Sequence, residues 1–79
     1  MKLNLSELEN ILGSSVINSD VTFEGISIDS RTIKKNELYI PIKGENFDGH
    51  KFILDAVNNG ACALVTEKEY ANIPYIKVA

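Results

Sequence analysis

The sequence has little of what several large classes of protein require. It contains one cysteine and one histidine, which excludes an internal disulfide and leaves no recognisable cluster of metal ligands. Its eight basic residues are outnumbered by eleven acidic ones, for a net charge of −3, so it has no basic field to hold a nucleic-acid backbone. No apolar run approaches the roughly 20 residues that span a bilayer, and the start resembles no secretory signal. We therefore expect a cytoplasmic protein that binds no nucleic acid and does not insert into membranes.

The composition is that of an ordinary globular domain. Hydrophobic residues make up 44% of the sequence and charged residues 24%, which is far from the balance of a disordered or fibrous chain. A chain of 79 residues forms one small domain, residues 1–79, of modest stability when isolated. Because the chain stops directly after an apolar run at residues 73–78, we expect it to be a fragment of a longer protein.

Apolar residues recur at helical spacing over residues 5–12, and a glycine follows them. This pattern predicts a first helix that ends at that glycine. Two capping-box patterns fit its start equally well, Ser6 with Glu9 and Asn4 with Glu7. The polar residues at 14–15 and 18–20 predict a connector over residues 14–20.

The remaining chain alternates between strand and helix patterns. It predicts a strand, a break at Glu24 and Gly25, and a second strand within residues 21–30, followed by strands at 38–42, 61–66 and 73–78. A second helix is expected from Phe52 to Gly60, and a single helical turn at residues 67–71. The order predicts a small α/β sandwich of two or three layers with a mixed sheet, because the crossover through the second helix favours parallel neighbours. The order of the strands stays open.

Three polar residues, Asp29, Ser30 and Arg31, follow the clearest strand pattern. Ligands of α/β sheets usually sit at the carboxyl ends of strands, which favours a binding role for these side chains. Asp and Ser also commonly bond their own backbone in turns, and Arg31 could pair with Asp29. The pattern leaves both interpretations open.

The loop of residues 44–50 (GENFDGH) lies between a strand and a helix, where two glycines let a ligand approach the backbone. It is not the phosphate loop of nucleoside triphosphatases, because His50 and Lys51 stand where that motif needs lysine and a hydroxyl residue. We interpret His50 as a structural hydrogen-bonding residue, not a catalytic one.

The aromatic residues and the cysteine are interpreted mainly as core. Phe23, Tyr39 and Phe52 stand in apolar patterns, whereas Phe47 has polar neighbours and is the one aromatic placed to stack on a flat base. Cys62 lies in an expected buried strand with no second thiol or nearby histidine, which favours packing over catalysis.

Three pieces of the sequence, taken in order, resemble the first domain of the Mur ligases. They are DSR at 29–31, KGENFDGHKFI at 43–53 and NGACALV at 59–65. The middle piece is most similar to the members that join D-alanyl-D-alanine to UDP-N-acetylmuramoyl-tripeptide (MurF type). It is next most similar to those that add the third amino acid (MurE type). The sequence departs from the family at Asn36 and Glu37, where a turn containing glycine is usual.

The resemblance implies a three-domain, ATP-dependent amide ligase of peptidoglycan synthesis that uses Mg²⁺. The first domain would hold the UDP end of UDP-N-acetylmuramoyl-tripeptide, while missing domains would bind ATP and D-Ala-D-Ala. This fragment would therefore hold no cofactor and would not be catalytic alone. The alternative is a non-catalytic module of the same fold that binds a nucleotide or a protein. The positions that match contacts to the UDP part are Ile28, Ser30, Glu45, Asn46 and Phe47. Asp29, Arg31 and Lys43 would contact phosphate or serve as framework.

Overall fold

The computed structural model describes residues 2–13, 15–41 and 49–78 of the chain. The described part contains two helices, one 3-10 turn and seven short strands, joined by loops. In chain order they are β1 (Leu3–Asn4), α1 (Leu5–Leu12), β2 (Ser15–Ile17), β3 (Thr22–Phe23), β4 (Gly25–Ser27), β5 (Glu37–Tyr39), η1 (Gly49–Phe52), α2 (Ile53–Asn58), β6 (Ala63–Thr66) and β7 (Tyr75–Val78). No described helix has the length and apolarity needed to cross a membrane.

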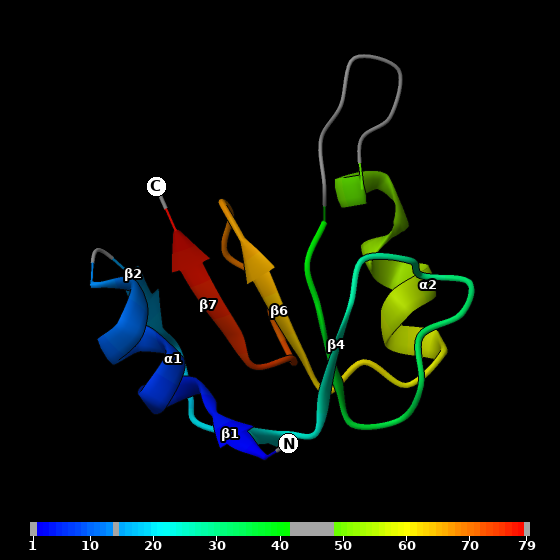
Figure 1. Ribbon diagram of the computed structural model, residues 1–79. Helices are drawn as coiled ribbons and strands as arrows, with labels where there is room; N and C mark the ends of the chain where they lie inside the picture. The colour runs from blue at the N-terminus through cyan, green and yellow to red at the C-terminus, as the bar shows by residue number, and fades with distance from the viewer. Residues whose placement is uncertain (1, 14, 42–48, 79) are drawn as a thin grey trace.

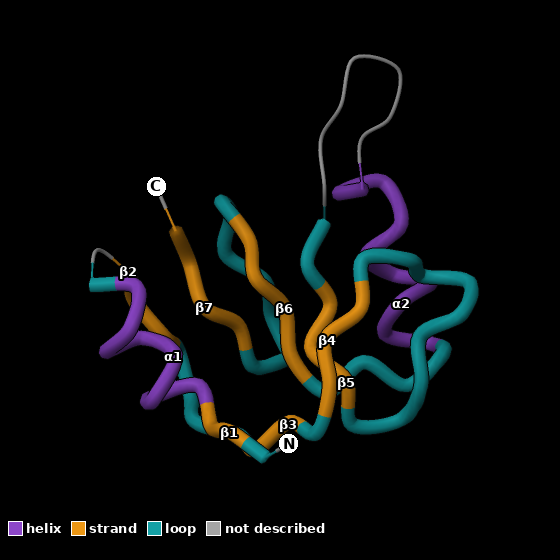
Figure 2. Tube along the Cα trace, in the orientation of Figure 1, coloured by secondary structure: helices purple, strands orange, loops and turns teal. Residues whose placement is uncertain are grey.

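A five-stranded mixed sheet in the order β2-β7-β6-β5-β4 forms the centre of the molecule (Figures 1 and 2). The strands β4 to β7 run parallel to one another, and β2 pairs antiparallel with β7 at one edge. β1 and β3 form a separate antiparallel pair. The parallel pairing of β5 with β6 confirms the expected crossover through the second helix, because neighbouring parallel strands need such a connection.

The two faces of the sheet carry separate hydrophobic cores. Adjacent residues on β5 point to opposite faces, so Tyr39 packs in the cluster that contains Ile53 and Ala56 of α2, while Leu38 packs in the cluster that contains Leu5 of α1. The two helices therefore cover opposite faces (Figure 1). The sequence allowed a sandwich of two or three layers, and the structure has three layers.

The start of α1 settles which capping box forms. The Asn4 side chain accepts a hydrogen bond from the backbone N–H of Glu7 at 2.9 Å, and the Glu7 carboxylate accepts one from the backbone N–H of Asn4 at 3.2 Å. Two of the free N–H groups at the helix start are thus satisfied. The helix ends, as expected, at Gly13, which has a φ of 80°.

Two sequence-based expectations about local structure were wrong. Residues 15–17, expected within a connector, form the edge strand β2, because they pair with β7 through contacts such as Ile17 with Ile76. Residues 67–71, expected as a helical turn, contain no helix. The backbone N–H of Lys68 donates to the Thr66 hydroxyl at 3.0 Å, a local side-chain bond that competes with helix formation.

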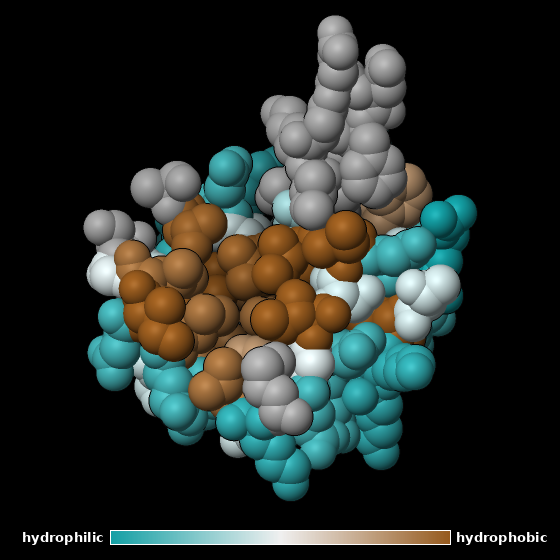
Figure 3. Space-filling model, viewed as in Figure 1, coloured by the Kyte–Doolittle hydropathy of each residue, from teal (hydrophilic) through white to brown (hydrophobic). Residues whose placement is uncertain are grey.

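The face of the sheet that carries α1 is open towards β4. Ile26 pairs with the buried Leu38 in parallel register, so its side chain lies on this face, yet it is 48% exposed, and Ile28 beyond it is 53% exposed. Apolar side chains gather across this side of the molecule (Figure 3). Ile28 thus brings apolar surface to the carboxyl end of β4.

Candidate functional site

A tight turn follows the carboxyl end of β4. The Ser27 hydroxyl donates to the carbonyl of Asp29 at 3.1 Å and accepts from its N–H at 3.1 Å. The Asp29 carboxylate accepts from the backbone N–H of Arg31 at 2.9 Å, and the N–H of Thr32 donates to the Asp29 carbonyl at 3.3 Å. The turn interpretation of this segment is therefore confirmed, and the turn fixes where Ser30 lies between its neighbours.

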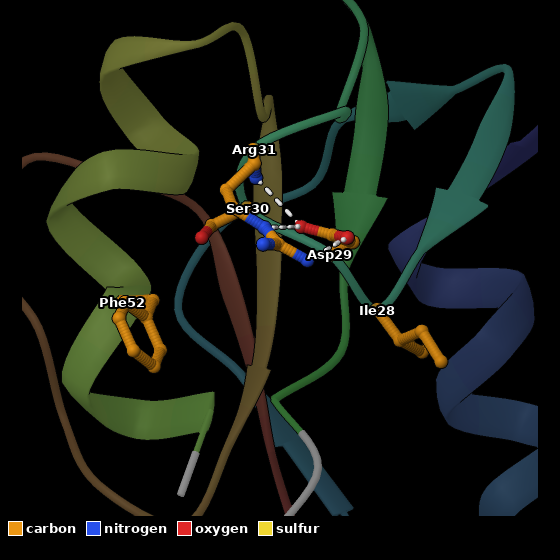
Figure 4. Close-up of a pocket in the computed structure, with 5 residues that line it drawn as sticks. All are labelled: Ile28, Asp29, Ser30, Arg31 and Phe52. Atoms are coloured by element: carbon orange, nitrogen blue, oxygen red, sulfur yellow. Dashed lines mark hydrogen bonds and ion pairs between the residues drawn. The ribbon is translucent and has the colours of Figure 1, made fainter. Parts of the chain in front are cut away.

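Asp29 and Arg31 form a two-pronged ion pair on this turn. The Arg31 Nε and Nη2 atoms donate to the two carboxylate oxygens of Asp29, each at 3.1 Å (Figure 4). These hydrogen bonds from the Arg31 side chain are the main cause that lowers the pKa of Asp29, and the same bonds raise the pKa of Arg31. Both groups stay charged at neutral pH, and two donors of the guanidinium are directed at Asp29.

Ser30 is buried, with 4% of its surface exposed. Its carbonyl accepts a hydrogen bond of 2.8 Å from the side-chain amide of Asn59, at the end of α2. This contact joins two segments 29 positions apart, so local sequence patterns gave no sign of it. The turn after β4 is thereby tied to the helix that covers the α2 face of the sheet.

A pocket of about 540 Å³ opens at this turn. The described residues that line it are Ile28, Asp29, Ser30, Arg31 and Phe52. Figure 4 shows Ile28 and Phe52 on opposite sides of the turn, with the ion pair between them. The pocket thus combines two apolar side chains with a hydroxyl and a charged pair, a combination suited to a ligand with a flat ring and polar groups. Its place at the carboxyl end of a parallel strand is where α/β sheets bind ligands.

The structure brings together part of the site that the sequence indicated. Ile28 and the three residues 29–31 line one pocket. Lys43, Glu45, Asn46 and Phe47 lie outside the described residues.

Phe52 was expected in the core, yet it is only half-buried and lines the pocket. Phe23 and Tyr39, by contrast, are fully buried, as expected. The helical spacing of apolar residues predicted that Phe52 packs in the core. In the structure Phe52 is the last residue of η1 and lies beside the turn after β4. The spacing of apolar residues carries no information about that neighbour.

Neither the cysteine nor the acidic residues form a reactive centre in the described part of the chain. Burial raises the pKa of the Cys62 thiol, so the thiol is protonated and weakly nucleophilic at neutral pH. Over residues 2–13, 15–41 and 49–78, no group of three or more His, Cys, Asp or Glu side chains could hold a metal ion.

Comparison with known proteins identifies the family. Residues 22–78 match the model of the Mur ligase family, catalytic domain. The UDP-N-acetylmuramoyl-L-alanyl-D-glutamate--2,6-diaminopimelate ligase of Clostridium tetani is 41% identical over 99% of this chain and 17% of its own length. The UDP-N-acetylmuramoyl-tripeptide--D-alanyl-D-alanine ligase of Haemophilus influenzae is 38% identical over 92% of this chain and 16% of its own length.

The fold is also that of solved structures. The chain superposes over its whole length on 18% of MurF from Acinetobacter baumannii, with a TM-score of 0.86 and 24% identity. The chain spans about one sixth of the length of the curated relatives named above. The family model that covers most of the chain and the identity to these two ligases show that this protein belongs to the Mur ligase family.

Proposed function

We propose that this domain binds the uridine diphosphate end of a UDP-N-acetylmuramoyl-peptide. The observation that carries the proposal is the pocket at the end of β4, which is lined by Ile28, Ser30 and Phe52. Both curated relatives carry the name of such a nucleotide sugar in their own names. The flat faces of the uracil ring suit apolar side chains, whereas the diphosphate needs hydrogen-bond donors.

The charges of the domain limit how the diphosphate is held. The net charge is −3, and the Arg31 guanidinium directs two donors to Asp29. We therefore assign Asp29 and Arg31 to the framework of the turn, and the Ser30 hydroxyl and backbone N–H groups to the phosphates. By the resemblance, Lys43 would contact phosphate or serve as framework, and Glu45, Asn46 and Phe47 would contact the UDP part.

The whole protein, on this proposal, is a cytoplasmic ligase of peptidoglycan precursor synthesis. Segments beyond this chain would bind ATP and Mg²⁺ and bring the amine that attacks the activated substrate. The sequence of residues 44–50 favours addition of D-Ala-D-Ala to the tripeptide. The identity of 41% to a diaminopimelate ligase favours the alternative, addition of the third amino acid. Assay of the full-length protein with each amine and its matching UDP substrate separates the two.

Replacing Ser30 with alanine in the full-length protein is expected to raise the KM for the UDP substrate. Loss of one hydrogen bond to a charged group corresponds to a rise of roughly tenfold. We expect kcat to change less than twofold, because the contact lies at the nucleotide end and not at the reacting carboxylate. Steady-state kinetics at saturating ATP measures both constants.

Thr32→Ala is the matched control, since Thr32 is an exposed hydroxyl residue of the same turn and lines no part of the pocket among the described residues. Its KM should equal that of the unchanged protein. An unaltered KM in the Ser30 variant would contradict the assignment of Ser30 as a contact.

A further inference from the structure

The turn after β4 is shaped by its own hydrogen bonds, but these do not fix its distance from α2. The bonds among Ser27, Asp29 and Arg31 all join residues within the turn. The pocket, however, lies between this turn and Phe52, which stands at the junction of η1 and α2. Its width therefore depends on contacts between the turn and the helical segment.

Asn59 provides such a contact. Its amide Nδ2 atom donates to the Ser30 carbonyl at 2.8 Å, and the helix end does not need this side chain. The backbone N–H of Asn59 already bonds the carbonyls of Asp55 at 3.0 Å and Ala56 at 3.2 Å, and the N–H of Gly60 bonds the Val57 carbonyl at 3.2 Å, so backbone groups cap these carbonyls of the last turn. The amide group is thus free to hold the turn.

The chain around this contact is closely packed. The N–H of Asn36 donates to the Gly60 carbonyl at 3.1 Å, and a Cβ atom on Gly60 would lie 2.9 Å from the Lys35 backbone. The buried Ile33 packs in the same core as Ala56 of α2. These contacts anchor the far end of the loop, at residues 33–36, whereas Asn59 anchors the end that carries Ser30.

We propose that Asn59 is a positioning residue for the nucleotide site, which rests on the function proposed above. Its amide holds the Ser30 carbonyl against the end of α2 and so sets the place of the Ser30 hydroxyl relative to Phe52. The short helix α2 joins the two sides of the pocket as one rigid element, with Phe52 at its start and Asn59 at its end. Asn59 is not among the described residues that line the pocket.

The test uses the full-length protein with Asn59→Ala and Asn59→Asp. Aspartate keeps the shape of asparagine but, when ionised, only accepts hydrogen bonds, so it removes the donor without removing the volume. Both variants are expected to raise the KM for UDP-N-acetylmuramoyl-tripeptide about fivefold, the effect of one neutral hydrogen bond. The KM for ATP and kcat should stay within twofold, a separation that general loss of structure would not produce.

A double variant shows whether Asn59 acts through Ser30. If it does, Asn59→Ala should raise the KM by less in the Ser30→Ala background than in the unchanged protein. Asn58→Ala is the matched control, because Asn58 is the exposed neighbour on α2. It should leave all constants unchanged.

The outcomes distinguish failure of the positioning role of Asn59 from failure of the proposed nucleotide site. An unchanged KM in both Asn59 variants, with a raised KM in Ser30→Ala, overturns the positioning role and leaves the nucleotide site standing. Equal loss of kcat and of affinity for both substrates also overturns it, since that pattern marks damage to the fold. An unchanged KM in Ser30→Ala overturns both.

Discussion

Replacing Gly60 with alanine is expected to lower the free energy of unfolding of the domain by about 2–4 kcal/mol, from backbone strain and a steric clash together. Gly60 has a φ of 122°, a conformation that residues with a side chain rarely adopt. A Cβ atom there would lie 2.9 Å from both the N and the Cα atoms of Lys35. Because these are backbone atoms, the loop that carries the pocket would have to move. Urea unfolding of the 79-residue chain measures the loss.

Gly13→Ala separates the strain from the clash. Gly13 also has a positive φ, 80°, but an added Cβ would meet no atom within 4 Å. The strain alone should cost about 1 kcal/mol. Equal losses in the two variants would show that the close approach of Gly60 to Lys35 has no energetic effect.

Truncation of Leu64 to alanine is expected to cost about 3–4 kcal/mol, within the range of buried leucine truncations. Leu64 is fully buried, lies on β6 between β5 and β7, and packs in the core under α2. The free energy of unfolding of a protein domain is only about 5–15 kcal/mol. The variant should therefore unfold at a much lower urea concentration.

Leu54 offers the matched control, because it is a leucine on α2 with 77% of its surface exposed. Leu54→Ala should change the free energy of unfolding by less than about 0.5 kcal/mol. If Leu54→Ala lowered the free energy of unfolding as much as Leu64→Ala, the assignment of Leu64 to the core and of Leu54 to the surface would be contradicted.

The sequence predicted the elements whose signal is local. The spacing of apolar residues over 5–12 and the polar groups before them predicted α1 and its capping box, and the structure settled the choice in favour of Asn4. Alternation at residues 26–29 predicted β4, with Ser27 as its last residue in the structure. These patterns succeed because each residue's partner lies within a few positions along the chain.

Features that depend on distant partners were missed. β2 has three residues, and its strand conformation comes from pairing with β7 at the other end of the chain. The bond from Asn59 to Ser30 and the place of Phe52 beside the turn also arise from how α2 packs on the sheet. By contrast, the departure from the family at Asn36 has a simple local reason. Asn36 has a φ of 68°, a left-handed conformation that asparagine tolerates nearly as glycine does.

The most direct test of the proposed nucleotide site is a titration of the full-length protein, labelled at its isoleucine methyl groups, with UDP-N-acetylmuramoyl-tripeptide. Ile28 lines the pocket, whereas Ile11 lies on α1 and is 71% exposed. We predict that the Ile28 methyl signal shifts in a saturable way, with UDP alone as well as with the complete substrate, while the Ile11 signal stays in place. An Ile28 signal that does not move at substrate concentrations that support turnover would contradict the proposed nucleotide site.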